Sequence, residues 1–101
     1  RNQAYDIWQP DITWCGGITA GLRIVEMAKA AKVEVVPHRG AEPWGLHLIA
    51  ASDCEDFAEF LPGVRGAGRD DLWLGAPEPV NGYIEIGGEP GFGVKPNEDL
   101  L

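Results

Sequence analysis

The chain has 101 residues and a formal net charge of −8, which bounds it as one small domain or a piece of a larger one. Residues 1–47 contain five basic and five acidic residues, whereas residues 48–101 contain three and eleven, so the acidic excess lies in the second half. Because nucleic acids and anionic membranes attract basic proteins, this charge argues against both as partners. The apolar fraction of 45% argues against wholesale disorder.

The two cysteines, Cys15 and Cys54, are too few for a disulfide scaffold and too far apart for a CxxC motif. Reduced thiols in a cytoplasmic protein fit this usage best. No segment approaches the ~20 apolar residues of a membrane span, and residues 1–4 lack the apolar core of a signal peptide. The sequence also lacks an initiator Met and enters an expected strand almost at once, so we expect a chain cut within a domain.

The first third of the chain predicts a strand, a helix and a second strand. Residues 5–8 are a short apolar run and residues 33–36 are rich in β-branched side chains, so both are expected strands. Between them we expect a helix over 20–31 with Thr19 as its N-cap, because apolar residues recur there at helical spacing. The expected apolar stripe consists of Leu22, Ile24, Val25, Met27, Ala28 and Ala31. This order predicts a βαβ unit with parallel strands.

The middle of the chain predicts a polar loop over 39–45 and a short apolar helix over 46–51. A third strand is expected within 56–61, ending near Glu59.

Turn signals dominate the remainder. Residues 62–71 predict a loop rich in Gly and Arg, and two prolines with an Asn-Gly pair predict a turn over 77–82. Residues 83–86 alternate like a strand, residues 87–93 predict another turn, and residues 95–101 are expected to be extended or frayed.

Asp11, His38 and Glu59 each follow one of these short apolar runs. Repeated βα units place strand ends on one face, and in (β/α) barrels that face carries the chemistry. Neighbouring strands lie about 4.8 Å apart, which would bring Asp11 and His38 within side-chain reach of each other. A carboxylate beside an imidazole fixes its tautomer and stabilises the imidazolium, which suits His38 to act as a general base. A structural His–Asp pair without catalysis explains the spacing equally well.

Other side chains near these strand ends are further candidates. Glu59, kept protonated by neighbouring carboxylates, could donate a hydrogen bond to a developing oxyanion. The alternative is a surface glutamate, because Asp and Glu are rarely buried. Arg39, Glu42 and Trp44 lie in the loop after the second strand and are candidate contacts for the polar end of a substrate, with ordinary loop solvation as the alternative. His47 lies in an apolar stretch, which favours a supporting role over that of a base.

The sequence predicts no metal site and no phosphate-binding loop. It has no HxH pair, no His and acid spaced to meet on one predicted helix, and no cysteine set. Gly16 and Gly17 lack the spacing of a GxGxxG motif.

The motif at 6–19, Asp-Ile-Trp-Gln-Pro-Asp-Ile-Thr-Trp-Cys-Gly-Gly-Ile-Thr, resembles the C-terminal third of the mandelate racemase subgroup of the enolase superfamily. Val-Val-Pro-His at 35–38 belongs to the same resemblance, and residues 9–17 are similar to sugar-acid dehydratases of that subgroup. Pro-Val-Asn-Gly at 79–82 and Pro-Gly-Phe-Gly-Val at 90–94 resemble the closing segment of that family. The resemblance covers nearly the whole chain.

The resemblance implies an α/β fold in which this chain supplies strands six to eight and the closing tail of a (β/α)₇β TIM-like barrel. Residues 1–76 would belong to the barrel domain, and residues 77–101 would return toward a capping domain that this sequence lacks. The remainder of the barrel and the capping domain are then expected partners. Because the family is often oligomeric, the resemblance also implies a homo-oligomer.

The resemblance further implies a lyase that dehydrates acid sugars, converting an aldonate to a 2-keto-3-deoxy acid. Asp11 and His38 match an Asp–His dyad with His38 as the general base, and Glu59 matches an electrophilic glutamate after the last strand. Sites of this superfamily use a base together with Mg²⁺, which stabilises an ene-diolate. The three carboxylates that bind Mg²⁺ in this family lie on earlier strands, outside this sequence. A whole barrel takes ~250 residues, so the 101 residues alone are expected to be inactive.

One loop departs from the family pattern. His38 is followed by Arg-Gly-Ala-Glu-Pro-Trp, where the similar dehydratases usually have Gly and Ser, and the loop is one residue longer. Loops at a barrel mouth determine the substrate, so the acid sugar stays open. A racemase or epimerase of the same superfamily, and a non-catalytic fragment that packs against a partner, are the alternatives.

Overall fold

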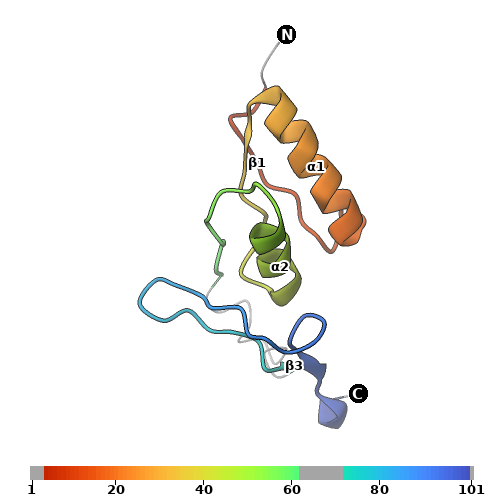
Figure 1. The fold of residues 1–101 in the computed structure, drawn as a ribbon. Helices are drawn as coiled ribbons and strands as arrows, with labels where there is room; N and C mark the ends of the chain where they lie inside the picture. The colour runs from red at the N-terminus through yellow and green to blue at the C-terminus, as the bar shows by residue number, and fades with distance from the viewer. Residues whose placement is uncertain (1–3, 62–71, 101) are drawn as a thin grey trace.

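The computed structural model describes residues 4–61 and 72–100, so the expected loop over 62–71 lies outside the described residues. The described chain is elongated, with principal extents of 51 × 26 × 26 Å. Its elements in chain order are β1 (Ile7–Trp8), α1 (Gly17–Ala31), β2 (Glu34–Val35), α2 (Pro43–Ala51), β3 (Trp73–Leu74), β4 (Lys95–Pro96) and a 3₁₀ helix (Glu98–Leu100). Figure 1 shows α1 with β1 at one end, α2 in the middle, and residues 72–100, here termed the C-terminal region, at the other end.

β1 and β2 pair in parallel, which confirms the predicted strand–helix–strand unit. The register joins Ile7 to Glu34 and Trp8 to Val35, and an isolated parallel bridge between Asp11 and His38 continues it. Both strands are shorter than expected. Nevertheless, the segments that follow β1 and β2 stay in the same register as far as Asp11 and His38, two residues of the candidate site.

Helix α1 begins at Gly17, three residues before the predicted start. The predicted N-cap was wrong, because Thr19 lies inside the helix and Gly16 takes the cap position with a φ of 109°. Glycine reaches this left-handed region without the steric penalty of a side chain, so it turns the chain into the helix although it offers no capping group. The predicted end at Ala31 is confirmed, and the backbone N–H of Lys32 donates to the carbonyls one turn back.

The core lies between α1 and β2. Val25, Ala28 and Val35 are buried there, and Trp8 and Cys54 pack against them as partly buried neighbours. Apolar burial of this kind is the main favourable term in folding. The core is small because each strand contributes only a few side chains.

A glycine replaces part of the predicted apolar stripe of α1. The buried positions are Gly21, Val25 and Ala28, whereas Met27 is 62% exposed. A Cβ atom on Gly21 would lie 3.0 Å from Ile12 Cδ1 and 3.1 Å from a Leu48 methyl group. The absent side chain therefore allows close approach of α2 to α1, a contact that a pattern of apolar residues does not reveal.

Helix α2 begins at Pro43, three residues earlier than predicted. Proline suits the first turn of a helix because the N–H it lacks has no partner there. A Cβ atom on Gly45 would lie 2.7 Å from the carbonyl oxygen of Gly40 and 2.8 Å from its Cα. Gly45 is therefore the helix residue on which the preceding turn packs, and Leu48 on the same helix is fully buried.

The expected strand within 56–61 is absent from the described structure. The segment still runs beside the β2 region, since the N–H of Glu55 donates to Val35 O (3.2 Å) and the N–H of Ala41 donates to Glu59 O (3.1 Å). These bonds form no ladder because the chain between Val35 and Ala41 makes a turn, in which the N–H of Gly40 donates to Pro37 O. The prediction was thus wrong in element type but right in position.

The C-terminal region contains a short antiparallel pair that the sequence did not predict. β3 pairs with β4, joining Trp73 to Pro96 and Leu74 to Lys95, where an extended or frayed tail was expected. A 3₁₀ helix over Glu98–Leu100 follows. The pair connects residues on both sides of the expected boundary between 76 and 77.

The predicted Asn-Gly turn is confirmed. Asn81 and Gly82 both have positive φ, 51° and 83°, as a two-residue hairpin turn requires. The flanking Val80 and Tyr83 exchange two backbone hydrogen bonds of 2.8 and 3.0 Å. The prediction of a strand over 83–86 was wrong, because within these residues only Tyr83 takes part in a bridge.

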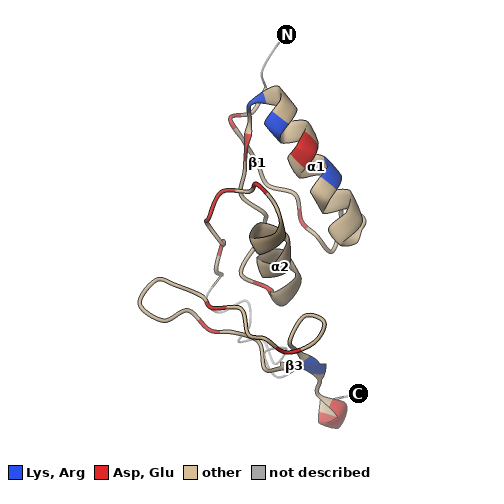
Figure 2. Cartoon of the chain, viewed as in Figure 1, with Lys and Arg blue, Asp and Glu red and all other residues tan. Residues whose placement is uncertain are grey.

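Charge is distributed unevenly over these elements. Figure 2 shows basic residues along α1, whereas acidic residues recur along the segment after α2 and in the C-terminal region. Among the described residues, neither helix has the length and apolarity needed to cross a bilayer.

Candidate active site

Asp11 and His38 lie opposite each other just beyond β1 and β2. They are bridge partners on parallel strands, and the N–H of His38 donates to Pro10 O at 3.1 Å. The expectation that strand pairing brings these two residues together is confirmed at the level of the backbone.

The carboxylate that contacts the His38 imidazole belongs to Glu59. His38 Nδ1 lies 2.9 Å from Glu59 Oε2, and the two side chains are 45% and 30% exposed. The same Oε2 accepts the backbone N–H of Arg39 at 2.7 Å. With the Ala41 N–H on its carbonyl oxygen, Glu59 is attached to the turn after β2 through both its side chain and its backbone. The structure thus contains a carboxylate–imidazole pair, with a different acid from the predicted one.

Asp11 instead bonds to its own turn. Its Oδ1 accepts the backbone N–H of Thr13 at 2.8 Å and the Thr13 hydroxyl at 2.6 Å. Among the described residues no side-chain contact joins Asp11 to His38. Aspartate readily bonds to backbone groups two residues on, which is the local competition that the strand-spacing argument left out.

Arg39, Glu42 and Trp44, the three predicted substrate contacts, are joined to one another. The Arg39 guanidinium forms an ion pair with Glu42 through Nη2 and Oε1. Trp44 Nε1–H donates to the other carboxylate oxygen, Glu42 Oε2, at 2.8 Å. The Glu42 side chain is only 19% exposed, so solvent screens these contacts less than it would on an open surface.

Aromatic rings from the C-terminal region pack around Trp44. Its ring lies edge-on to Trp73 with centroids 5.9 Å apart and to Phe92 at 6.4 Å. Phe92 also meets the His47 ring at 5.3 Å, and His47 Nδ1 lies 2.6 Å from Pro43 O. The sequence analysis missed Trp73 and Phe92, because they lie far along the chain and carry no local signal of this contact.

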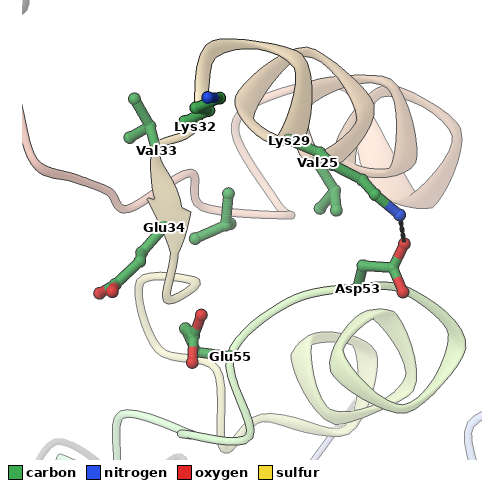
Figure 3. Close-up of a pocket in the computed structure, with 8 residues that line it drawn as sticks. Val25, Lys29, Lys32, Val33, Glu34, Asp53 and Glu55 are labelled. Carbon is green, nitrogen blue, oxygen red and sulfur yellow. Dashed lines mark hydrogen bonds and ion pairs between the residues drawn. The ribbon is translucent and has the colours of Figure 1, made fainter.

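One hollow borders the candidate site, and another lies apart from it. A cavity of about 100 Å³ borders the aromatic cluster, with His47, Glu89 and Phe92 among its lining residues. A larger groove of about 380 Å³ lies between the last turns of α1, β2 and the segment after α2 (Figure 3). It is lined by Val25, Lys29, Lys32, Val33, Glu34, Val35, Asp53 and Glu55. None of these residues belongs to the candidate site, so the groove is separate from it.

The larger groove contains an exposed ion pair between Lys29 and Asp53, which Figure 3 marks. The hydrogen bond from Lys29, followed by its charge, holds the pKa of Asp53 below its usual value. The reciprocal contact raises the pKa of Lys29. Both groups are mainly exposed, so the pair is a surface contact.

Two further possibilities, a reactive thiol at Cys54 and a metal site, find no support among the described residues. Partial burial is the main cause that raises the pKa of the Cys54 thiol, which keeps it protonated near neutral pH. Within residues 4–61 and 72–100, no group of three or more His, Cys, Asp or Glu side chains is arranged to hold a metal ion. The described residues therefore do not fit a magnesium site by themselves.

Comparison with known proteins establishes the family. Residues 1–100 match the family described as "Enolase C-terminal domain-like". The "Putative L-rhamnonate dehydratase" of Caldivirga maquilingensis is 37% identical over 101 residues, which cover 95% of this chain and 25% of that protein. The crystal structure titled as a putative racemase from Roseobacter denitrificans matches with a TM-score of 0.76 and 28% identity, covering 96% of this chain and 29% of that one. The chain thus spans about a quarter of the curated relative, and it belongs to the C-terminal domain family of the enolase superfamily.

Proposed function

We propose that this chain is the C-terminal part of an enzyme that dehydrates acid sugars, with His38 as the base. The observation that carries the proposal is the 2.9 Å contact between His38 Nδ1 and Glu59 Oε2 beyond the end of β2. Membership of the enolase superfamily and the dehydratase relative support the same reaction class. The chain would supply strands six to eight of a (β/α)₇β barrel, with residues 1–76 in the barrel and 77–101 closing toward a capping domain.

The contact with Glu59 determines which nitrogen of His38 can act. An imidazole that donates its Nδ1–H to a carboxylate has its lone pair on Nε2. In the proposed reaction Nε2 takes the proton α to the substrate carboxylate, and the electron pair of the C–H bond moves onto that carboxylate. As the electrons return, the C–O bond to the 3-hydroxyl breaks and the His38 imidazolium protonates the leaving oxygen. Water leaves, and the enol product tautomerises to a 2-keto-3-deoxy acid.

Glu59 and Asp11 have supporting roles in this proposal. Glu59 orients the imidazole through Oε2. The electrophilic role that the resemblance implies for it requires the protonated acid, in which Oε2 still accepts from Nδ1–H and Oε1–H donates to the enediolate. Asp11 is in register with His38, and it would complete a dyad only by leaving Thr13 and replacing Glu59 at Nδ1, because Nε2 has to keep its lone pair. Arg39 would bind the polar end of the substrate from the turn between these groups.

In this proposal the metal is held by residues outside the described part of this chain, as the resemblance implies. Superfamily sites use Mg²⁺ to stabilise an ene-diolate, but the described side chains form no cluster that fits it. The remaining barrel strands and the capping domain are therefore proposed partners, and the 101 residues alone are expected to be inactive. A cytoplasmic location, a homo-oligomer, and the absence of nucleic-acid and membrane partners stay predictions from the sequence.

The test is turnover of an acid-sugar panel by the native protein, with added Mg²⁺ and with a chelator. We expect 2-keto-3-deoxy acid formation with Mg²⁺ and its loss with the chelator. His38→Asn should abolish both turnover and α-proton exchange with solvent. Asp53→Asn is a matched control, since that exposed carboxylate lines the separate groove and should retain activity. Undiminished turnover in His38→Asn would refute the assignment of the base.

A racemase or epimerase is the second candidate, favoured by the structural likeness to the protein titled a putative racemase. Such a reaction needs a second base on the opposite face of the substrate, from a strand outside this chain. Incorporation of solvent deuterium at the α-carbon without loss of water would identify it and replace the dehydratase assignment.

A further inference from the structure

Two aromatic residues of the C-terminal region reach the candidate site from outside the βαβ unit. We propose that Trp73 and Phe92 position the Arg39 guanidinium through Trp44 and Glu42, and that they thereby control how tightly the site holds the polar end of a substrate, away from the reacting carboxylate. That Arg39 binds substrate rests on the proposed function. That the aromatic rings hold Arg39 in place is a separate inference, which the contacts of these residues support.

The first link is the ion pair of Arg39 with Glu42. A guanidinium carries five N–H donors in a rigid planar fork, so fixing one edge also fixes the direction of the others. The ion pair uses Nη2 at the tip of the side chain. The Arg39 backbone lies in a turn with a φ of 54°, and its own N–H donates to Glu59 Oε2. Both the backbone and the tip of Arg39 are therefore fixed relative to the His38–Glu59 pair.

The second link is the hydrogen bond from the Trp44 indole to Glu42. Glu42 takes the N-cap position of α2, but its side chain makes no capping bond. Its two oxygens instead accept from Arg39 and from Trp44, one each. An indole has a single N–H donor, so rotation of Trp44 would release one side of this carboxylate and allow it to turn away from Arg39.

The third link is the packing around the Trp44 ring. Trp73 meets it at an interplanar angle of 77° and Phe92 at 86°, both edge-on arrangements that aromatic rings prefer. Phe92 also contacts His47, which lies one helical turn after Trp44 and on the same face of α2. Phe92 therefore holds the indole against the helix, and Trp73 meets it as a second ring.

The C-terminal region is built to place these two rings together. Trp73 is on β3, whose partner β4 begins shortly after Phe92. Gly75 leaves β3 with a φ of 88°, and a Cβ atom there would lie 3.1 Å from the carbonyl oxygen of Gly93. The close crossing of these glycines brings together two aromatic residues that are far apart in the sequence.

The consequence is a separation of binding from chemistry. Arg39 and Glu42 neutralise each other, so the pair would recognise the hydroxyl groups of the polar end by directed hydrogen bonds more than by net charge. The His38–Glu59 contact has its own supports in the N–H groups of Arg39 and Ala41. Loosening the aromatic contacts should therefore raise KM and leave kcat nearly unchanged.

The position of Arg39 can be measured without any substrate. Phenylglyoxal modifies guanidinium groups, and peptide mass spectrometry of the native protein resolves each arginine. We expect Trp44→Phe and Phe92→Leu to speed Arg39 labelling at least about threefold, because the ion pair that protects it loosens. Tyr83→Leu is the matched control, an exposed aromatic residue of the same region, and should leave the rate within about twofold. Unchanged Arg39 labelling in both test variants would overturn the proposal.

Loss of the fold is distinguished by hydrogen exchange of the α1 amides, which lie away from these contacts. If α1 exchange rises together with Arg39 labelling in Phe92→Leu, that variant has unfolded. Trp44→Phe then decides whether the indole holds Glu42 against Arg39, because it removes the N–H donor and leaves a smaller aromatic ring in place.

Kinetics test whether this arrangement serves the proposed reaction. In the active native protein, Phe92→Leu should raise KM roughly tenfold, the loss expected for one weakened charged hydrogen bond, with kcat within about twofold. In an Arg39→Gln background the same change should have less than a twofold effect, whereas full additivity would refute the positioning role. If no acid sugar is turned over, the proposed function fails, and the Arg39 labelling rates still decide whether the rings position this side chain.

Discussion

Residues 4–61 and the C-terminal region are held together by different kinds of contact. All seven buried apolar residues of the described chain lie between Ile12 and Leu48. In the C-terminal region no described residue is buried, and large side chains such as Tyr83 and Val80 are 78% and 66% exposed. The first part has a core, whereas the second is held by turns, one short ladder and ring contacts on α2.

The difference shows how the candidate site divides its tasks. The His38–Glu59 pair rests on the core-forming part, where strand register and the packing of α2 fix the backbone. The rings of Trp73 and Phe92 come from the part without a core. Regions with few buried contacts open locally at low free energy, so the aromatic contacts should be the more easily altered half of the site.

The strongest test of this contrast is Leu48→Ala, which empties a fully buried position on α2. Large-to-small changes in a core cost about 2–5 kcal/mol, because burial is lost and a cavity remains. Hydrogen exchange of the α1 and α2 amides under native conditions should show that the Leu48→Ala variant has a free energy of opening lower by this amount. Leu100→Ala, at a half-exposed position of the C-terminal region, should change it by less than about 0.5 kcal/mol. Equal effects of the two changes would contradict the contrast.

Gly45→Ala tests the close approach between α2 and the turn after His38. The new methyl group would lie within 2.8 Å of Gly40 backbone atoms, which cannot move as a flexible side chain does. Overpacking of this kind costs about 1–3 kcal/mol, in a helix where alanine would otherwise be preferred. Exchange of α2 amides measures the cost. Gly87→Ala is the matched control, because nothing lies within 4 Å of its Cβ position and its φ is ordinary.

Gly82→Ala should act within the C-terminal region alone. Gly82 has a φ of 83° and open space around its Cβ position, so the cost is the conformational penalty of about 1–2 kcal/mol for a left-handed residue. Exchange of the Val80 and Tyr83 amides, which bond to each other across the turn, should speed up while α2 amides stay unchanged. Faster exchange throughout α2 would show that the two regions unfold as one unit.

The sequence predicted the core-forming part better than the C-terminal region, for reasons visible in single residues. The βαβ order and the proximity of Asp11 to His38 follow from apolar periodicity, which is a local signal. The buried position of Gly21 was not predicted, because a helix contact that depends on the absence of a side chain does not appear in a pattern of apolar residues. The Asn-Gly turn was predictable, since only a few residues adopt its backbone conformation readily.

The sequence named candidate residues but not the contacts they make. The structure joins His38 to Glu59 and joins Arg39 and Trp44 to Glu42, and the roles of these residues stay predictions. Which acid contacts the histidine depended on local competition, because a threonine follows Asp11 two residues on. The aromatic rings that pack on the site arrive through β3 and the turn before β4, and pairing between such short strands has no signature in sequence.

The smallest predicted effect comes from the Lys29–Asp53 pair, which joins α1 to the segment after α2. The pKa of Asp53 is lowered below its ordinary value of 3.8, so its stabilising contribution is complete above that pH and is lost as the pH falls through the lowered value. Lys29 has a raised pKa, so its contribution is complete below 10.5 and is lost as the pH rises through the raised value. Nuclear magnetic resonance titration of the Asp53 carboxyl should give a midpoint below 3.8 that returns toward 3.8 in Lys29→Met. Because both side chains are 69% exposed, Asp53→Asn should change α1 exchange at neutral pH far less than Leu48→Ala does. An effect as large as that of Leu48→Ala would mean that this surface ion pair contributes as much as the core to holding α1 in place.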